Sequence, residues 1–366
     1  MPTMKRALLI ASPSGGLRGP INDVKTMEAI LSQQGFEVLS CCDVKATRQG
    51  IMDAWETIIK VSQAGDVVVI YYSGHGGIVE DDSSEPSVAE EGDLTQQQSW
   101  RYQFLVPMDF SDPTAADGAS SFNGILDVEL EDLLRRTTDR TENVTTIFDC
   151  CHSGRMARDP SHTGAVPRNL PKIRFPKLQF ASVSQKVERL RETNGDLAKT
   201  YLHNEGNRHA VRIAAAGALE TAWEDGDHDQ RAGVMTRELA RALREAWEVN
   251  DGANQISWQN MSLRVSELVN VNFPRQNPYV EGPQRRMLFS LDESETNAVV
   301  LHPDGQHGIL KAGRISSVRE GNVYALMPLL VGSERIREET KIGEATVTEV
   351  RALESVATLS ILPNRD

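Results

Sequence analysis

Short apolar runs alternate with amphipathic runs through roughly the first 290 residues, and this alternation restricts the fold more than any other feature of the chain. The strand-like runs lie at 4–11, 36–42, 66–72, 103–107, 143–149, 210–215 and 286–290. The helix-like runs lie at 22–34, 47–64, 127–136, 236–247 and 260–271, with Thr47 and Thr236 as predicted N-caps and Gly35 closing the first helix. Strands joined by crossover helices pair in parallel, and such sheets are covered on both faces. The sequence therefore predicts an α/β fold with a mostly parallel central sheet flanked by helices on both faces.

The texture of the sequence changes near residue 292. Beyond it, short β-branched runs at 298–301, 322–325, 344–350 and 355–362 are separated by glycine and charged turns. Such spacing is typical of a small all-β domain. We therefore predict two domains, 1–292 and 293–366. Within the first, an acidic loop at 79–102 and a basic linker at 155–208 interrupt the alternation.

Composition narrows the range of partners. A formal net charge of −13 argues against nucleic acid and anionic membranes as partners. No apolar stretch is long enough to span a bilayer, and the N-terminal apolar run is too short for a signal peptide. The cysteines form two adjacent pairs, Cys41-Cys42 and Cys150-Cys151, which does not resemble a secreted disulfide framework. These features lead us to expect a cytoplasmic protein.

Two short motifs follow predicted strands and carry reactive side chains. They read Tyr-Tyr-Ser-Gly-His-Gly at 71–76 and Asp-Cys-Cys-His-Ser-Gly at 149–154. Open α/β sheets build their sites at the carboxyl ends of strands, so we expect His75 and Cys151 to lie close together. A nearby imidazole activates a thiol by removing its proton and can later return that proton to a leaving amine. The backbone N–H groups of Gly76 and Cys151 are candidate oxyanion donors.

Two other interpretations of these motifs stay open at this point. Both residues could be ordinary strand-end positions, since buried cysteines are common and inert. Alternatively, a metal site could form from four nearby candidates, Cys150, Cys151, His152 and His75. Adjacent cysteines do not easily bind one tetrahedral zinc ion, and the chain has no C-x-x-C spacing. Because both motifs follow apolar strands, a catalytic role is favoured over the two alternatives, and we expect no resident metal.

The two motifs resemble the catalytic motifs of the caspase-like cysteine peptidases, specifically the metacaspase and orthocaspase branch. Further segments that resemble this family lie at 17–24, 104–109, 125–130, 233–236 and 276–278. The likeness covers roughly residues 4–290 in the order of the family fold. The animal caspase motif Gln-Ala-Cys-x-Gly is absent from the sequence, so cleavage after aspartate is not implied. The resemblance implies a caspase-like fold and a cysteine endopeptidase that works through a thioester acyl-enzyme.

By this resemblance, His75 and Cys151 form the dyad, with Cys151 as nucleophile because it directly precedes His-Ser-Gly. The family cuts after Arg or Lys, and the positions that match its acidic pocket are Asp23 and Asp149, with Ser73 nearby. A carboxylate at the pocket floor pairs with a basic side chain and disfavours an acidic one. An alternative role for Asp23 is to stabilise a helix N-terminus.

The resemblance also implies how the protein is activated. We expect a zymogen that is cut within the 155–208 linker by itself or by an upstream protease, although a merely solvated basic linker is the alternative. No cofactor is expected to be required. Calcium activates many family members, and the candidate ligands here are Asp81, Asp82, Asp109 and Asp112. Pro20 stands where metacaspases often carry a cysteine.

A second hypothesis comes from another class of function. The chain could be a catalytically idle scaffold whose caspase-like fold binds other proteins. Loss of the histidine or the cysteine would favour this hypothesis, and both are present. The expected partners are therefore protein or peptide substrates with Arg or Lys at the cut site.

Overall fold

The computed structural model describes most of the chain, in two units. The described residues are 3–81, 101–111, 122–151, 164–170, 173–175, 183–184, 187–190, 192, 207, 209–217, 220–227, 229–249, 256–294, 299, 301–310, 318–328, 340–351 and 354–363. One compact unit comprises Met1–Arg241 with Val265–Gln284, and the other comprises Ala242–Arg264 with Arg285–Asp366. Helices α6 (Val234–Val249) and α7 (Trp258–Asn270) contribute residues to both units. The domain boundary at 292 stays a prediction.

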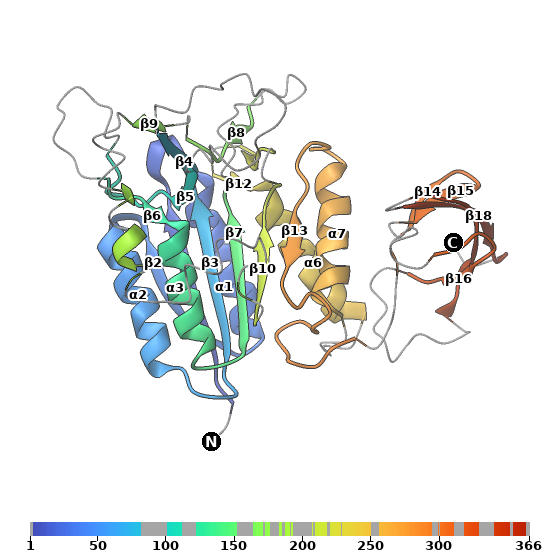
Figure 1. The fold of residues 1–366 in the computed structure, drawn as a ribbon, viewed down its shortest axis with the longest axis horizontal. Helices are drawn as coiled ribbons and strands as arrows, with labels where there is room; N and C mark the ends of the chain where they lie inside the picture. The colour runs from blue at the N-terminus through green and yellow to red at the C-terminus, as the bar shows by residue number, and fades with distance from the viewer. Residues whose placement is uncertain are drawn as a thin grey trace. The chain divides into compact units, whose positions relative to one another are not determined.

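A six-stranded sheet forms the centre of the first unit (Figure 1). Its strands are β1 (Lys5–Ser12), β2 (Phe36–Cys42), β3 (Val67–Gly74), β7 (Asn143–Asp149), β10 (Ala210–Ala214) and β13 (Tyr279–Glu281). They are arranged in the order β13-β10-β7-β3-β1-β2, and all neighbours pair in parallel except β10 and β13. The predicted mostly parallel central sheet is confirmed.

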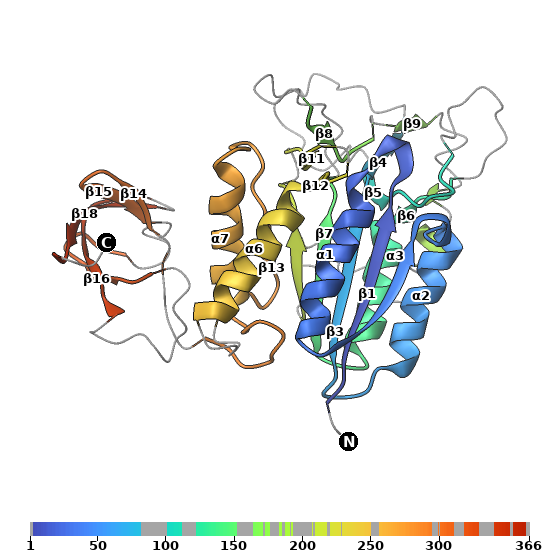
Figure 2. The ribbon, with the colours of Figure 1, turned by 180° about the vertical axis from the view of Figure 1, so that it is seen from behind.

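Helices cover both faces of this sheet, as Figures 1 and 2 show. Helix α1 (Gly19–Gln33) lies on one face, and α2 (Arg48–Val61) and α3 (Asp127–Thr138) lie on the other. Thr47 caps α2 by accepting a 3.0 Å hydrogen bond from the Gly50 amide, as predicted. Gly35 follows α1 with a φ of +80°, a conformation that glycine adopts without strain. Among the described residues, none of the helices combines the length and apolar character needed to cross a bilayer.

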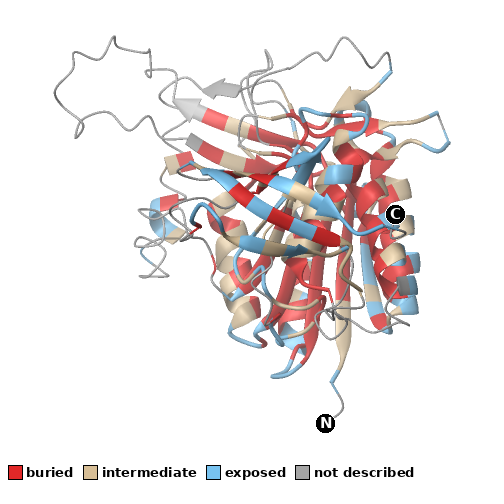
Figure 3. Ribbon diagram, turned by 90° about the vertical axis from the view of Figure 1, so that its right-hand side faces the viewer, coloured by how far each residue is buried: buried red, intermediate tan, exposed pale blue. Residues whose placement is uncertain are grey.

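Strand β3 is the centre of the hydrophobic core. Every residue of this strand is buried, and Figure 3 shows buried residues concentrated along the central strands. Ile70 of β3 belongs to the same apolar cluster as Leu8 of β1 and Trp55 of α2. The Trp55 indole N–H donates to Thr137 at 3.0 Å, so its polar atom is satisfied within the core.

Two smaller sheets lie beyond the carboxyl ends of the central strands (Figure 1). One contains β4 (Gly76–Asp81), β5 (Arg101–Leu105), β6 (Ile125–Leu126) and β9 (Ile173–Phe175), in the order β6-β5-β4-β9. The other contains β8 (Val166–Pro167), β11 (Trp223–Asp225) and β12 (Ala232–Gly233), in the order β12-β11-β8. The ends of the predicted acidic loop therefore belong to β4 and β5, while residues 82–100 lie outside the described residues.

Two local predictions were wrong. The segment 286–290 makes only isolated bridges, because Phe289 has a φ of +56° that interrupts an extended strand. The antiparallel edge strand is instead β13. Thr236 is not an N-cap, since α6 begins two residues before it and its hydroxyl donates to Asp149.

The second unit contains a five-stranded antiparallel sheet, which confirms the predicted small all-β part. Its strands are β14 (Leu301–Asp304), β15 (His307–Leu310), β16 (Val323–Leu326), β17 (Gly343–Val350) and β18 (Ser355–Ile361), in the order β14-β15-β18-β17-β16. Buried and exposed residues alternate along the first six positions of β17. Its buried Ala345 and Val347 pack with Ala357 and Leu310 in a separate small core.

Candidate active site

His75 and Cys151 leave the same edge of the central sheet. His75 directly follows β3, and Cys151 lies two residues beyond β7. These strands are neighbours in parallel register, with Ser73 opposite Asp149. Because each reactive residue lies two positions beyond that pair, the two leave their strands at the same level. Both are buried.

The backbone amides of Gly76 and Cys151 converge on one oxygen atom. Both donate to the carbonyl oxygen of Arg168, at 3.1 and 3.3 Å respectively. The Arg168 amide in turn donates to the Ala222 carbonyl at 2.8 Å, and the Cys151 sulfur lies 3.9 Å from that same carbonyl oxygen. The carbonyl oxygen of the linker residue Arg168 therefore accepts from the backbone amides of both predicted oxyanion donors.

The side chain of Arg168 is completely buried in an acidic pocket. Its Nη2 atom lies 2.5 Å from Asp23 Oδ2 and 3.6 Å from Glu224 Oε2. Its Nη1 atom lies 3.2 Å from Asp149 Oδ2 and donates to Ser73 Oγ at 2.9 Å. The structure thus brings together all three predicted pocket residues, and it adds Glu224. A guanidinium held by several carboxylates is the arrangement that makes burial of a positive charge tolerable.

Further hydrogen bonds fix the Asp23 carboxylate in this pocket. It accepts from the Gly233 amide at 2.9 Å and from the Ser73 hydroxyl at 2.7 Å. Because α1 begins at Gly19, Asp23 lies beyond its first turn, and the alternative helix-terminus role does not fit. Burial raises the pKa of Asp23 above its usual value, an effect that the Arg168 charge opposes. Burial alone would lower the pKa of Arg168, but the nearby Asp149 and Asp23 outweigh it and hold that pKa above its usual value.

Two glycines leave the space that the guanidinium occupies. A Cβ atom at Gly19 would lie 2.7 Å from Arg168 Nη2, and one at Gly233 would lie 2.5 Å from Arg168 Nη1. The Gly19 amide also donates to Glu224 at 3.0 Å, so the same backbone that makes room for Arg168 positions one of its carboxylates. Any larger residue at either position would compete with the basic side chain for space.

Sequence reasoning missed Arg168 and Glu224. Arg168 is one of many basic residues in the linker, and no local pattern separates it from the others. Glu224 follows Trp223 in a segment without a recognisable motif. Both reach the pocket through tertiary pairing, since β8, which precedes Arg168, pairs with β11, which contains Glu224.

The His75 ring is held in the neutral form. Burial and then the charge of Arg168 lower its pKa to about 4, against hydrogen bonds with the backbone of Arg168 and Gly15 that raise it. A Cβ atom at Gly15 would lie 2.8 Å from His75 Nε2, so the backbone approaches the ring closely there. The Nδ1 atom has no hydrogen-bond partner within the described part of the chain. A neutral imidazole with an unengaged nitrogen can accept a proton.

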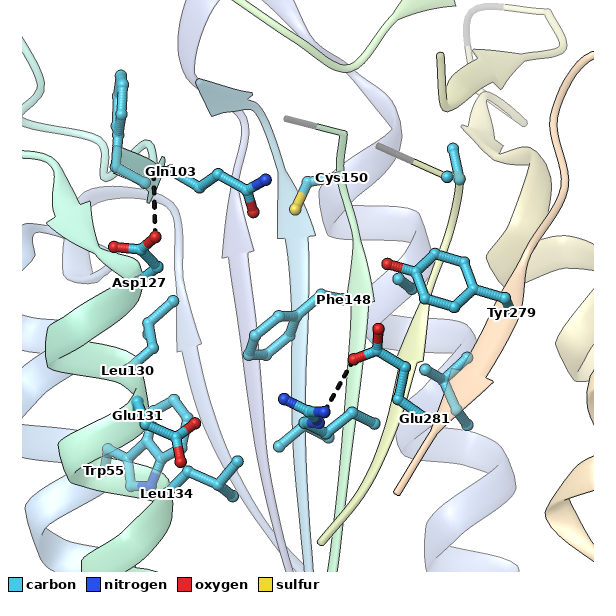
Figure 4. A pocket seen from close by; sticks show the side chains of 17 residues that line it. Trp55, Gln103, Asp127, Leu130, Glu131, Leu134, Phe148, Cys150, Tyr279 and Glu281 are labelled. Atoms are coloured by element: carbon cyan, nitrogen blue, oxygen red, sulfur yellow. Dashed lines mark hydrogen bonds and ion pairs between the residues drawn. The ribbon is translucent and has the colours of Figure 1, made fainter. Parts of the chain in front are cut away.

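Cys150 belongs to a different environment from Cys151. Its side chain lines a cavity of about 230 Å³ beside α3, β7 and β10, together with Phe148 and Tyr279 (Figure 4). Burial raises the pKa of Cys150 well above its usual value, which disfavours the thiolate. Of the other residues in the zinc interpretation, His152 lies outside the described residues. Among the residues that the structure describes, no group of three or more His, Cys, Asp or Glu side chains is placed to hold a metal ion.

Only one side chain of the four candidate calcium ligands is described. Asp109 accepts a 2.7 Å hydrogen bond from the Arg48 amide at the start of α2. Asp82 and Asp112 lie outside the described residues, as does the side chain of Asp81. Calcium dependence therefore stays a prediction.

Comparison with known proteins identifies the family. The family model for the caspase domain matches residues 4–289, so the chain belongs to the caspase-domain family of cysteine peptidases. The resemblance to metacaspases is also confirmed. Metacaspase-1 of Lodderomyces elongisporus is 32% identical over 164 residues, which cover 41% of this chain and 33% of that protein. Metacaspase III c of Phaeodactylum tricornutum is 30% identical over 164 residues, covering 41% of this chain and 43% of that protein.

The chain spans only about a third to two-fifths of the length of these two metacaspases. Among solved structures, a Geobacter sulfurreducens protein is 21% identical, with a TM-score of 0.47 over 76% of this chain and 94% of that one. The Drosophila initiator caspase Dronc is 9% identical, with a TM-score of 0.37 over 79% of this chain and 80% of that one.

Proposed function

We propose that the protein is a cysteine endopeptidase that cleaves peptide bonds after Arg or Lys, with Cys151 as nucleophile and His75 as general base and acid. The observation that carries this proposal is the position of Arg168. Its guanidinium occupies a pocket of three carboxylates while its carbonyl oxygen accepts from Gly76 and Cys151. A bound substrate arginine would need the same two sets of contacts.

The proposed reaction follows from these contacts. His75 takes the proton of the Cys151 thiol, and the sulfur attacks the carbonyl carbon of the bound basic residue. The negative charge that develops on the carbonyl oxygen is stabilised by the amides of Gly76 and Cys151. The C–N bond then breaks, His75 gives its proton to the leaving amine, and a thioester remains. Water hydrolyses the thioester, releasing the carboxylate product and the free thiol.

The same observation supports activation by cleavage of the linker. Arg168 lies within the predicted 155–208 linker and fills the pocket that a substrate side chain would need. We propose that the bond between Arg168 and Asn169 is the one cut when the zymogen matures, by the protein itself or by an upstream protease. The alternative prediction of a solvated linker does not hold for Arg168, which is fully buried.

The test is hydrolysis of fluorogenic peptides that differ only in the residue before the cut. Peptides ending in Arg or Lys should be hydrolysed, and those ending in Asp or Glu should not, because a further buried negative charge beside the three carboxylates of the pocket would be unpaired. The assay is run with and without calcium, because activation by calcium is an untested prediction from the family resemblance. Failure to hydrolyse any of these peptides in either condition would favour the idle scaffold.

We also propose a cytoplasmic location for the protein. All four cysteines are free thiols, which supports this location.

The low pKa of His75 predicts an unusual pH profile for cleavage of the docked linker. A base works in its deprotonated form, so its contribution is lost as the pH falls through its pKa. With a pKa of about 4 in place of the ordinary 6.5, the rate of linker cleavage should stay constant from neutral pH to about pH 5 and fall below that. Intact mass spectrometry of a single turnover measures this rate, with circular dichroism as the control for folding. A midpoint near 6.5 would contradict this prediction.

A further inference from the structure

The linker continues past Arg168 along a single strand of the fold. After the Arg168 carbonyl accepts from the Gly76 amide, the Leu170 amide donates to the Gly76 carbonyl at 2.9 Å. Further on, β9 runs parallel to β4, with Ile173 in register with Val79. The chain on the C-terminal side of the Arg168–Asn169 bond therefore pairs with β4 near both ends of that strand.

Within the part of the chain that the structure describes, β4 would be an edge strand without this segment. In its sheet, β5 pairs with one side of β4 and β9 pairs with the other. An edge strand presents a row of backbone donors and acceptors, which an extended polypeptide can pair with regardless of most of its side chains. Since β4 begins at the residue after His75, a strand added there starts at the bond to be cut.

We propose that β4 is the docking strand for the part of a protein substrate that follows the cut bond. The preferred substrates are then extended polypeptides that continue well past the cut bond. The part after the cut is at least as long as the stretch of linker between Arg168 and Phe175. This inference rests on the proposed endopeptidase function and adds a substrate class to it. The linker residues Asn169, Leu170 and Ile173–Phe175 are the first occupants of this docking strand and competitors of every later substrate.

The backbone pairing identifies which amides of such a substrate matter. Gly76 directs its amide and carbonyl toward the linker, and alternate residues of a strand face the same way, so Ile78 and Glu80 do so too. In the observed parallel register, the amides that face them belong to Ile173 and Phe175. The amide of Arg174 points to the other side of the strand.

The test compares four peptides as substrates of the full chain after it has been cut in the linker. A long peptide copies residues 164–177, and a short one copies the same sequence but ends after the position of Leu170. A third is the long peptide with N-methyl groups at the positions of Ile173 and Phe175, and a fourth has one at the position of Arg174. We expect the long and fourth peptides to have a kcat/KM about tenfold above the short and third ones, the effect of roughly two hydrogen bonds.

The outcomes separate the two proposals. If the short peptide is cleaved as efficiently as the long one, the docking role of β4 is wrong and the endopeptidase function stands. If the third and fourth peptides are cleaved equally well, backbone pairing is not the cause of any length preference, and the inference is again overturned. If none of the four is cleaved, the proposed function itself fails, and the inference fails with it.

Discussion

Replacing Cys151 with alanine is expected to lower the rate of hydrolysis of Arg peptides by about 10⁴-fold or more, because no other group supplies the nucleophile. The same variant should keep its linker intact at the Arg168–Asn169 bond if that cleavage is autocatalytic. The backbone amide of residue 151 is retained in the variant, so its hydrogen bond to the Arg168 carbonyl should persist. Initial rates with a fluorogenic peptide and intact mass spectrometry of the incubated protein measure the two effects.

The matched control for this variant is Cys150→Ala. Cys150 is the neighbouring cysteine, but it lines the cavity beside α3 and burial raises the pKa of its thiol. We therefore expect Cys150→Ala to keep most of the activity and to cut its own linker. Hydrolysis that survives Cys151→Ala, or disappears only in Cys150→Ala, would mean that the nucleophile has been assigned to the wrong residue.

The second large effect is expected for Asp23→Asn in the acidic pocket. The substitution keeps the shape of the side chain but removes one of the negative charges around a buried guanidinium. Loss of one partner of a buried ion pair costs about 3–5 kcal/mol, so kcat/KM for Arg peptides should fall by roughly 10²-fold to several 10³-fold. The docked linker loses the same contact, and the thermal stability of the uncut protein should fall as well.

A matched control and a second measurement keep this prediction specific to the pocket. Asp53→Asn removes an exposed carboxylate of α2 that contacts only Gln49 in the described hydrogen bonds, and it should leave both properties unchanged. The rate at which iodoacetamide alkylates Cys151 in the cut protein should be similar in Asp23→Asn and in the unsubstituted chain. An Asp23→Asn variant with unchanged kcat/KM for Arg peptides would show that the pocket does not select the basic residue.

The strand–helix pattern predicted most of the central fold because those elements are specified locally. β2 and β7 have the predicted bounds, since each is a short run enriched in residues that favour strands, such as Phe36 and Val38 in β2 and Val144 and Ile147 in β7. The run at 286–290 was misleading, because a positive φ at Phe289 is a backbone property that apolar composition does not reveal. Thr236 was misread for a related reason, since its hydroxyl has a tertiary partner in Asp149 rather than a local one.

The residues of the candidate site also fall into two groups, those that the sequence could predict and those that it could not. His75, Cys151, Asp23, Asp149 and Ser73 could be proposed from sequence because they belong to recognisable motifs or match a family pattern. Arg168 could not, since its burial depends on carboxylates far away in the sequence, such as Asp23. The short strands β8, β9, β11 and β12 were also missed, because two or three residues carry no periodic signal.

The complete burial of β3 has a consequence for how this site can open. Backbone segments that are fully enclosed and paired on both sides exchange their amide hydrogens last and take part only in global unfolding. Strand β3 is such a segment, and it continues directly into His75. The imidazole of His75 is thus attached to a strand that resists local unfolding. Access for an incoming polypeptide must therefore come from local opening of the surrounding linker segments, while the sheet itself remains stationary.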